Sequence, residues 1–318
     1  MSESRNTRSA NVDASDIATQ SRILRLAPEA VRPYLKLARI DRPIGTWLLL
    51  FPCWWSLTLG MAVVGGFRAG AWPPWELAVL FAVGALVMRG AGCTYNDIVD
   101  RDIDGRVART AGRPIPSGQV SVRGALVFMA LLMLTGLAVL LSLNRYAIAV
   151  GAASLLLVFP YPFMKRITWW PQAWLGLTFN WGALVGWPAV AGGLAAAPLL
   201  MYAAGFFWTL GYDTIYAHQD KEDDALIGVK SSARRLGART RPFLWVFYGV
   251  TVILLAASGW AAGTAWPFYA GLAAAAAQLA WQAAAVDTDS PRDCLAKFKS
   301  NKWFGLILLA GIVAAGRI

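Results

Sequence analysis

The sequence has few charged residues, few cysteines and a single histidine, and each shortage excludes a class of protein. Charged residues make up only 15% of the 318 positions against 57% hydrophobic residues, which excludes a soluble globular domain. The three cysteines, Cys53, Cys93 and Cys294, lie in or near apolar segments without metal-ligand spacing, so we expect reduced packing residues. His218 alone cannot form a zinc site.

The apolar residues are gathered into runs of about 20, the length that a helix needs to cross a bilayer. A β-barrel would instead show short alternating segments. The pattern therefore predicts an all-α polytopic membrane protein with nine transmembrane helices. Pro160, Pro162 and Pro188 are expected to kink or end their helices. The expected spans are roughly 44–64, 75–96, 122–143, 146–163, 172–193, 197–218, 242–262, 266–286 and 303–317.

The N-terminal region differs in composition from the rest of the chain. Residues 1–30 are polar and lack the apolar core of a signal peptide, so we expect a disordered cytoplasmic tail and insertion directed by the first span. Residues 31–42 predict a short amphipathic helix on the membrane surface. Residues 31–318 are then one membrane domain.

The distribution of basic residues predicts the orientation. The net charge of +11 indicates basic cytoplasmic loops and contact with anionic membrane lipid, and no nucleic acid partner. Among the 29 Lys and Arg residues, only Arg68, Arg145 and Arg317 fall on the opposite side, and Arg89 lies within a span. The rule that positive loops stay inside therefore places both the N-terminus and the acidic clusters described next in the cytoplasm.

Two short segments, residues 95–104 and 212–224, hold nine of the 18 acidic residues. Each closes an apolar run, and they lie about 117 positions apart, which suggests two similar four-helix halves with the ninth span added. If the helices continue through the clusters, each presents oxygen ligands within an arc of ~80° or less. The two stripes are Asn96, Asp100 and Asp104 on the first segment and Asp213, Asp220 and Asp224 on the second.

Crowded carboxylates at the membrane repel one another, and a divalent cation relieves this repulsion. Ligand sets made only of oxygen favour Mg²⁺, which also bridges carboxylates to substrate phosphates. The plain alternative is that Asp-rich loops face water, and it applies equally well to Asp102, Glu222 and Asp223 on other helix faces.

Basic residues follow each cluster, and arginine forks suit phosphate oxygens. Arg109, Arg113 and Lys230 lie close behind the acids and are candidate phosphate ligands, while Lys165 and Arg166 end the fourth span as further candidates. The pattern suits a substrate with a diphosphate head and an isoprenoid tail. Ionisation would leave an allylic cation for an electron-rich acceptor. Membrane topology is the main explanation for Arg234, Arg235, Arg239 and Arg241.

Both aspartate motifs resemble those of the UbiA-type membrane prenyltransferases. They read Asn96-Asp97-x-x-Asp100-x-x-x-Asp104 and Asp220-x-x-x-Asp224, and the resemblance covers the chain after about residue 32. The segments 37–49, 92–97, 109–114 and 212–220 are similar to the branch that prenylates 4-hydroxybenzoate in ubiquinone biosynthesis. The resemblance implies nine helices around a central cavity that opens laterally to lipid.

The resemblance also implies two Mg²⁺ ions and a reaction. A polyprenyl group passes from polyprenyl diphosphate to the ring carbon ortho to the hydroxyl of 4-hydroxybenzoate. The ring proton passes either to a carboxylate or to the released pyrophosphate. The implied metal ligands are Asn96, Asp100, Asp220 and Asp224, and Asp97, Asp104 and Asp213 support catalysis or bind the metal through water.

The carboxylate of the benzoate needs a cation, which we assign to Arg42 or Arg39 ahead of Lys165 and Arg166. The alternative for Arg39 and Arg42 is that they reach lipid headgroups. Other acceptors would be homogentisate, dihydroxynaphthoate, a chlorophyllide or haem. An ion transporter is a rival class, but these acids lie at helix ends rather than at mid-bilayer. The expected location is the bacterial or mitochondrial inner membrane, with the site facing the cytoplasm or matrix.

Overall fold

The described part of the chain is built from helices alone. The computed structural model describes residues 21–65, 75–106, 110–226 and 228–317, and every regular element in these ranges is an α- or 3-10 helix. This confirms the all-α prediction. The elements up to residue 179 are α2 (Arg22–Leu26), α3 (Arg32–Leu37), α4 (Ile44–Val63), α5 (Trp75–Asp104), α6 (Val122–Leu141), α7 (Arg145–Ala153), α8 (Leu155–Val158), η1 (Tyr161–Phe163), α9 (Met164–Ile167) and α10 (Pro171–Phe179).

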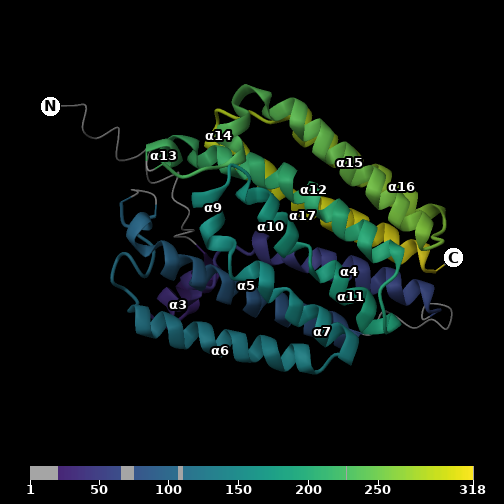
Figure 1. Cartoon of the computed structure of the whole chain (residues 1–318), viewed down its shortest axis with the longest axis horizontal. Helices are drawn as coiled ribbons and strands as arrows, with labels where there is room; N and C mark the ends of the chain where they lie inside the picture. Colours follow the sequence, from purple (N-terminus) through teal and green to yellow (C-terminus); the bar gives the residue numbers. More distant parts are fainter. Residues whose placement is uncertain (1–20, 66–74, 107–109, 227, 318) are drawn as a thin grey trace. The chain divides into compact units, whose positions relative to one another are not determined.

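The remaining elements include the longest helices of the C-terminal part (Figure 1). They are α11 (Gly182–Ala191), α12 (Ala196–Ala217), η2 (His218–Asp220), α13 (Lys221–Leu226), α14 (Ser232–Leu236), η3 (Gly237–Arg239), α15 (Thr240–Ala261), α16 (Trp266–Ala285) and α17 (Pro291–Ala315).

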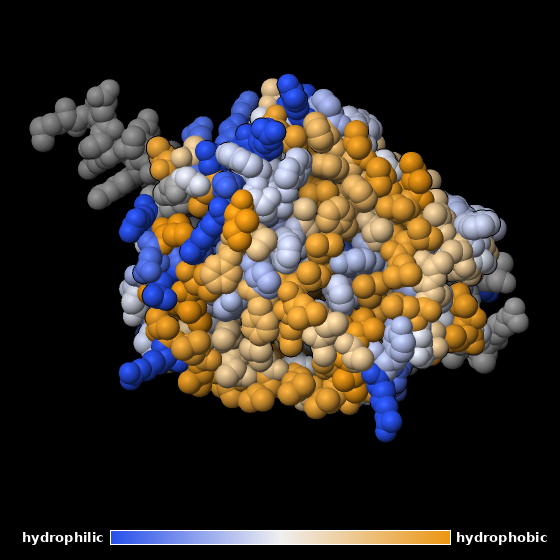
Figure 2. Space-filling view, in the orientation of Figure 1, coloured by the Kyte–Doolittle hydropathy of each residue, from blue (hydrophilic) through white to orange (hydrophobic). Residues whose placement is uncertain are grey.

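Six helical segments in the described ranges are long and apolar enough to cross a membrane. They are 44–63, 75–104, 122–141, 145–167, 232–261 and 291–315. The segment 122–141 exposes large apolar side chains such as Leu131 at 58% and Leu134 at 61%, and apolar residues cover the surface there (Figure 2). Since exposed apolar surface of this extent is costly in water, lipid is the natural solvent for α6.

Several predicted spans are interrupted. The span predicted over 172–193 divides between α10 and α11, where the side-chain amide of Asn180 donates to the Gly176 carbonyl and to Thr209 Oγ1. Pro160 and Pro162 stand where α8 gives way to η1, as expected, because proline lacks the N–H that an α-helix needs. Pro188 lies inside α11, which ends at Ala191 before the left-handed Gly192.

The N-terminal segment also differs from its prediction. Part of the expected disordered tail, Arg22–Leu26, is helical, while residues 1–20 lie outside the described residues. The amphipathic helix predicted over 31–42 ends at Leu37. Arg39 then takes a left-handed backbone conformation with φ 56°, and Pro43 disfavours helical geometry at Arg42 before it.

The chain divides into two compact units, and each is described by itself. The first unit comprises residues up to 45 together with 86–137. Its core joins Leu37, Ile115, Val120 and Ala125, with Tyr34, Ile98, Val122 and Phe128 packed around them. The core therefore fixes α3, the loop after α5 and the start of α6 against the second half of α5, which carries the first acidic cluster.

The second unit comprises residues 46–85 and 138–318, and its long helices α12, α15, α16 and α17 lie side by side (Figure 1). Trp55, Trp208 and Phe304 form a buried aromatic centre, with Trp55 and Trp208 ring centroids 5.2 Å apart. At the contact of α16 and α17, a Cβ on Gly271 would lie 2.6 Å from the Gly311 Cα, so only glycine permits this approach. The unit thus holds α12, which ends at the second acidic cluster.

Candidate active site

The first acidic cluster lies on one uninterrupted helix, because α5 continues to Asp104. This confirms the assumption behind the first stripe. Asp97 and Asp100 have no exposed surface and Asp104 is 5% exposed, whereas the Asp102 side chain is 77% exposed and lies 3.6 Å from Arg101. The cluster therefore separates into a buried face and one residue that faces water.

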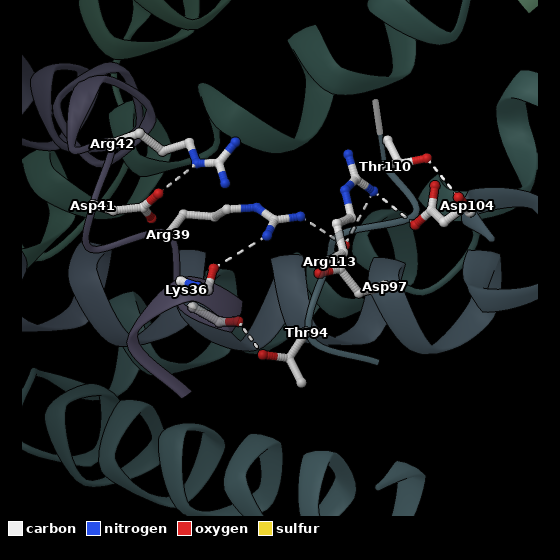
Figure 3. A network of polar contacts seen from close by, with 10 residues as sticks. Lys36, Arg39, Asp41, Arg42, Thr94, Asp97, Asp104, Thr110 and Arg113 are labelled. Carbon is white, nitrogen blue, oxygen red and sulfur yellow. Dashed lines mark hydrogen bonds and ion pairs between the residues drawn. The ribbon is translucent and has the colours of Figure 1, made fainter. Parts of the chain in front are cut away.

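Two arginines from distant segments meet the buried carboxylates (Figure 3). Arg39 Nη2 lies 2.7 Å from Asp97 Oδ1. Arg113 Nη1 lies 3.3 Å from the same Asp97 oxygen and 2.7 Å from Asp104 Oδ2. Removing one partner of such a buried pair typically costs about 3–5 kcal/mol, because the other charge stays buried without compensation. The structure thus brings together four predicted site residues: Arg39, Asp97, Asp104 and Arg113.

The loop after α5 is held in place by its own hydrogen bonds. The Thr110 hydroxyl donates to the Asp104 carbonyl at 2.8 Å, and the Arg113 amide donates to the Thr110 carbonyl at 2.9 Å. These contacts return the chain toward α5, which explains how an arginine nine positions after Asp104 reaches its carboxylate. Arg109, the other candidate phosphate ligand here, lies outside the described residues.

A second pair of charges lies beside this network. Arg42 Nε donates to Asp41 Oδ2 at 3.2 Å, and the Asp41 side chain has no exposed surface. Asp41 is not among the site residues predicted from the sequence, because its role depends on burial. Arg89 is expected only as a charge within a span. A Cβ on Gly45 would lie 2.0 Å from the Arg89 Cζ, so the Gly45 backbone leaves room for this guanidinium. A cation within an apolar span is by default a functional candidate.

The second acidic cluster does not lie on one continuous helix. The structure replaces the expected helix by α12, the 3-10 turn η2 and α13, so the stripe calculated for Asp213, Asp220 and Asp224 was wrong in its geometry. All three residues are half-buried. A 3-10 turn rotates the chain by about 120° per residue instead of 100°, which changes the direction of every following side chain.

The segment after the second cluster folds back on it. The Val229 amide donates to the Asp224 carbonyl at 2.9 Å. Arg234 donates to the same carbonyl at 3.1 Å and also to that of Val229, and its guanidinium lies 5.4 Å from the Trp169 ring. The sequence explains Arg234 mainly by membrane topology and does not predict these contacts.

Three predicted cations meet on this segment. Lys230 donates its backbone N–H to the Lys165 carbonyl at 3.0 Å and its ammonium to the Ile167 carbonyl at 3.1 Å. Lys165 and Arg166 both lie on α9, and the Arg166 guanidinium lies 5.8 Å from the Phe163 ring centroid. The structure therefore places Lys230 against α9, the helix that carries Lys165 and Arg166.

A neutral polar contact supports the second cluster from behind. Thr214 Oγ1 lies 2.7 Å from Ser232 Oγ, and the Ser232 amide donates to Gln172 Oε1 at 3.0 Å. Thr214 and Ser232 have no exposed surface. This contact ties α12, α14 and α10 together directly next to Asp213.

His218 is buried directly after α12. Its Nε2 lies 2.9 Å from Thr240 Oγ1, and Thr240 donates its own hydrogen to the Gly237 carbonyl. The imidazole Nε2 must therefore carry the hydrogen of this contact. Burial, helped by the charge of Lys221, lowers the pKa of His218 from 6.5 to about 4. Nearby, the Lys221 ammonium donates to Asp289 and lowers the pKa of that exposed carboxyl.

Acidification is expected to destabilise the protein through His218. Its folded-state pKa lies below its unfolded value, so the contribution is complete above pH 6.5 and is lost as the pH falls toward 4. The whole effect is at most about 3 kcal/mol. His218→Gln keeps a donor toward Thr240 and has no imidazole to protonate. Melting in detergent at pH 7 and pH 5 should show a smaller loss for this variant than for the wild type, and an equal loss would contradict the assignment.

The donor set in both clusters fits a hard divalent cation. Among the residues that the structure describes, no three carboxylate, imidazole or thiolate groups converge as a ready metal site. Asp97 and Asp104 contact arginine, and the Asp100 carboxylate and the Asn96 amide lie one turn apart on the same helix. Mg²⁺ typically takes one or two protein carboxylates and completes its shell with water and substrate phosphate, so such small oxygen sets suit it.

The comparisons with known proteins identify the family of the chain. The family model described as "UbiA prenyltransferase family" matches residues 49–307. The chain is 53% identical over 287 residues to the mitochondrial 4-hydroxybenzoate polyprenyltransferase of Arabidopsis thaliana, which covers 90% of this chain and 69% of that protein.

Solved structures share the fold. An apo structure of a UbiA homolog from Aeropyrum pernix K1 has a TM-score of 0.67 and 28% identity, and covers 82% of this chain and 97% of that one. A UbiA homolog from Archaeoglobus fulgidus bound to GPP and Mg²⁺ has a TM-score of 0.63 and 19% identity, with 90% and 100% covered. The sequence match over most of the chain shows that it belongs to the UbiA prenyltransferase family.

Proposed function

We propose that this chain transfers a polyprenyl group from polyprenyl diphosphate to the ring carbon ortho to the hydroxyl of 4-hydroxybenzoate, in a Mg²⁺-dependent step of ubiquinone biosynthesis. The observation that carries the proposal is the buried carboxylate of Asp100, one turn from Asn96 on an apolar helix whose neighbouring acids bind Arg113. The Arabidopsis thaliana relative, which is 53% identical, is named 4-hydroxybenzoate polyprenyltransferase, and this name supports the choice of acceptor.

The two acidic clusters supply different parts of the proposed site. Mg²⁺, when bound, neutralises the charge that develops on the departing pyrophosphate. Asn96 and Asp100 hold it from the first cluster, and Asp220 and Asp224 from the second. Arg109, Arg113 and Lys230 bind diphosphate oxygens, with Lys165 and Arg166 beside Lys230.

The acceptor must be oriented so that its ortho carbon faces the prenyl group. In the proposal, Arg42 binds the benzoate carboxylate, and its partner Asp41 fixes the direction of the guanidinium. The apolar helices hold the isoprenoid tail and keep water from the allylic cation. The phenol oxygen makes the ortho carbon nucleophilic, and the ring proton leaves to a carboxylate, for which Asp213 is a candidate, or to the released pyrophosphate.

The proposal includes a membrane arrangement. The nine predicted helices surround a central cavity that opens laterally to lipid, with two similar four-helix halves and an added ninth helix. The chain resides in the bacterial or the mitochondrial inner membrane, and the site faces the cytoplasm or matrix. The name of the Arabidopsis thaliana relative, which includes "mitochondrial", supports an inner-membrane location.

A direct assay tests the reaction. Membranes that contain the protein are incubated with radiolabelled 4-hydroxybenzoate, a polyprenyl diphosphate and Mg²⁺, and the lipid extract is counted. Labelled prenylated product is expected, and EDTA should abolish it. Parallel arms with homogentisate and dihydroxynaphthoate should give little product. Absence of product from 4-hydroxybenzoate, with product from another acceptor, would overturn the acceptor while keeping prenyl transfer.

A further inference from the structure

Asp97 belongs to the first acidic cluster but not to the stripe of Asn96, Asp100 and Asp104. Asp97 lies seven residues before Asp104, so the two side chains leave α5 within about 20° of one another. Asp100 lies about 60° away around the helix. This geometry allows one arginine, Arg113, to contact both Asp97 and Asp104.

Asp97 carries two cations on one carboxylate oxygen. Its Oδ1 accepts from Arg39 at 2.7 Å and lies 3.3 Å from Arg113 Nη1 (Figure 3). A divalent cation bound to this carboxylate at about 2.1 Å would stand within a few ångströms of two guanidinium charges. In a site without exposed surface such like-charge repulsion is barely screened. Both contacts are to Oδ1, and the buried Oδ2 has no hydrogen-bond partner, so a cation at Oδ2 would have to bind next to both guanidinium charges, and this repulsion argues against direct metal ligation by Asp97.

Arg39 has a strained backbone conformation that its side-chain contacts stabilise. Among the described residues, Arg39 is the one non-glycine residue with positive φ, at 56°. Such a conformation persists only where the surroundings determine it. The Arg39 side chain is 8% exposed, donates to the Lys36 carbonyl at 3.1 Å and binds Asp97, so these contacts offset the backbone strain.

The two arginines come from the two segments that cover α5. Arg39 follows α3, and Arg113 lies in the loop after α5, while Leu37 and Ile115 of the same segments pack together in the core. The two segments thus contact each other through Leu37 and Ile115, and their arginines both contact Asp97. Loss of its charge would remove the carboxylate contact of Arg39 to Asp97 and one of the two carboxylate contacts of Arg113, which would then depend on Asp104.

We propose that Asp97 is a positioning residue, not a metal ligand: it fixes Arg39 and Arg113 on α5, and so holds Arg113 where the diphosphate of the substrate is bound. Arg39 then belongs to this contact instead of to the benzoate carboxylate. The inference rests on the proposed function for the identity of the diphosphate. Its structural half, the coupling of Asp97 to Arg39, is independent of any activity.

The kinetic test uses Asp97→Asn, which keeps the shape and removes the charge. The KM for polyprenyl diphosphate should rise about 10–100-fold. Arg113 loses one of its two carboxylate contacts, and with it the position from which it makes a charge-assisted contact to the diphosphate. The Mg²⁺ concentration for half activation should stay within twofold of the wild type. A tenfold rise in that concentration with an unchanged KM would overturn the proposal, because a lost metal ligand gives that result.

The stability test uses protein in detergent with EDTA and without substrate. Asp97→Asn and Arg39→Gln should each lower the melting temperature by several degrees. The double variant should fall no further than the worse single variant, because the two groups form one pair. Additive losses would overturn the proposal. This measurement tests the pairing of Asp97 with Arg39 even if no acceptor is prenylated. Failure of this inference can therefore be distinguished from failure of the proposed function.

A further variant guards against misfolding. Should Asp97→Asn fail to fold, Arg39→Lys keeps the positive charge and loses the planar fork. It should give an intermediate loss of melting temperature, and again an unchanged Mg²⁺ requirement. An Arg39→Lys protein as stable as the wild type, with normal KM for the diphosphate, would contradict the positioning role.

Discussion

Replacing Asp100 by asparagine is expected to reduce prenyl transfer at least a thousandfold while leaving the protein folded. Asp100 is fully buried on α5, and asparagine has nearly the same volume, so the packing of the helix is retained. Activity is expected to fall because the substitution removes the carboxylate that binds Mg²⁺ in the proposed site. A thousandfold change corresponds to about 4 kcal/mol in the barrier, which is within the range for charge stabilisation in a catalytic centre.

The measurement is kcat at saturating substrates over a range of Mg²⁺ concentrations, with a melting curve for each protein. Asp102→Asn is the matched control, because Asp102 lies two residues away on the same helix and faces water. It should behave as the wild type. Near-normal activity in Asp100→Asn would remove Asp100 from the metal site.

The same experiment applies to the second cluster. Asp220→Asn should cause a loss of similar size, and the exposed Glu222→Gln serves as its control. If both Asp100→Asn and Asp220→Asn abolish activity and raise the Mg²⁺ requirement, the two clusters act on one substrate. A loss in one variant alone would limit the metal site to a single cluster.

The fold could be predicted to the extent that hydropathy determines it. Long apolar runs gave α4, α5 and α6 to within a few residues, apart from the end of α5, because the requirement to satisfy backbone groups in lipid leaves helices as the local solution. The breaks could not be found in this way. The interruption after α10 coincides with bonds from the Asn180 side chain to Gly176 and to Thr209 of another helix, and a contact 29 residues away leaves no local pattern.

The site, like the fold, could be predicted from the sequence only in part. Composition and spacing found the acids and most of the cations, because charged residues in an apolar chain are few and costly. They could not tell which acids would bind arginine. Asp97, for example, has two guanidinium partners, which come from 58 and 16 residues away. Such pairs depend on the turn at Arg39 and on the loop after α5, which no local rule predicts.

The second cluster shows the limit of helical arithmetic. The calculation for Asp213, Asp220 and Asp224 assumed one helix, and the turn η2 removes that assumption. A 3-10 turn is a common way to end an α-helix, but its position depends on tertiary contacts. The acidic residues of the second cluster could be identified from the sequence, whereas the directions of their side chains could not.

Replacing Arg42 by alanine is expected to raise the KM for 4-hydroxybenzoate about 10–100-fold with little change in the KM for polyprenyl diphosphate. The expectation follows from the loss of a charge-assisted hydrogen bond to the benzoate carboxylate, worth about 1.5–3 kcal/mol. Arg42 is positioned for such a role by Asp41, whose carboxylate is buried and accepts from Arg42 Nε at 3.2 Å.

A neutral substrate separates recognition of the carboxylate from a general loss of structure. The wild type should prefer 4-hydroxybenzoate to 4-hydroxybenzamide strongly, whereas Arg42→Ala should accept the two almost equally, because its site no longer contains the cation that discriminates between them. Arg101→Ala removes an exposed cation from α5 and is the control, with both preferences unchanged. If Arg42 instead reaches lipid headgroups, its variant keeps the preference for the benzoate, and the half-buried Arg89 beside Gly45 becomes the next residue to replace.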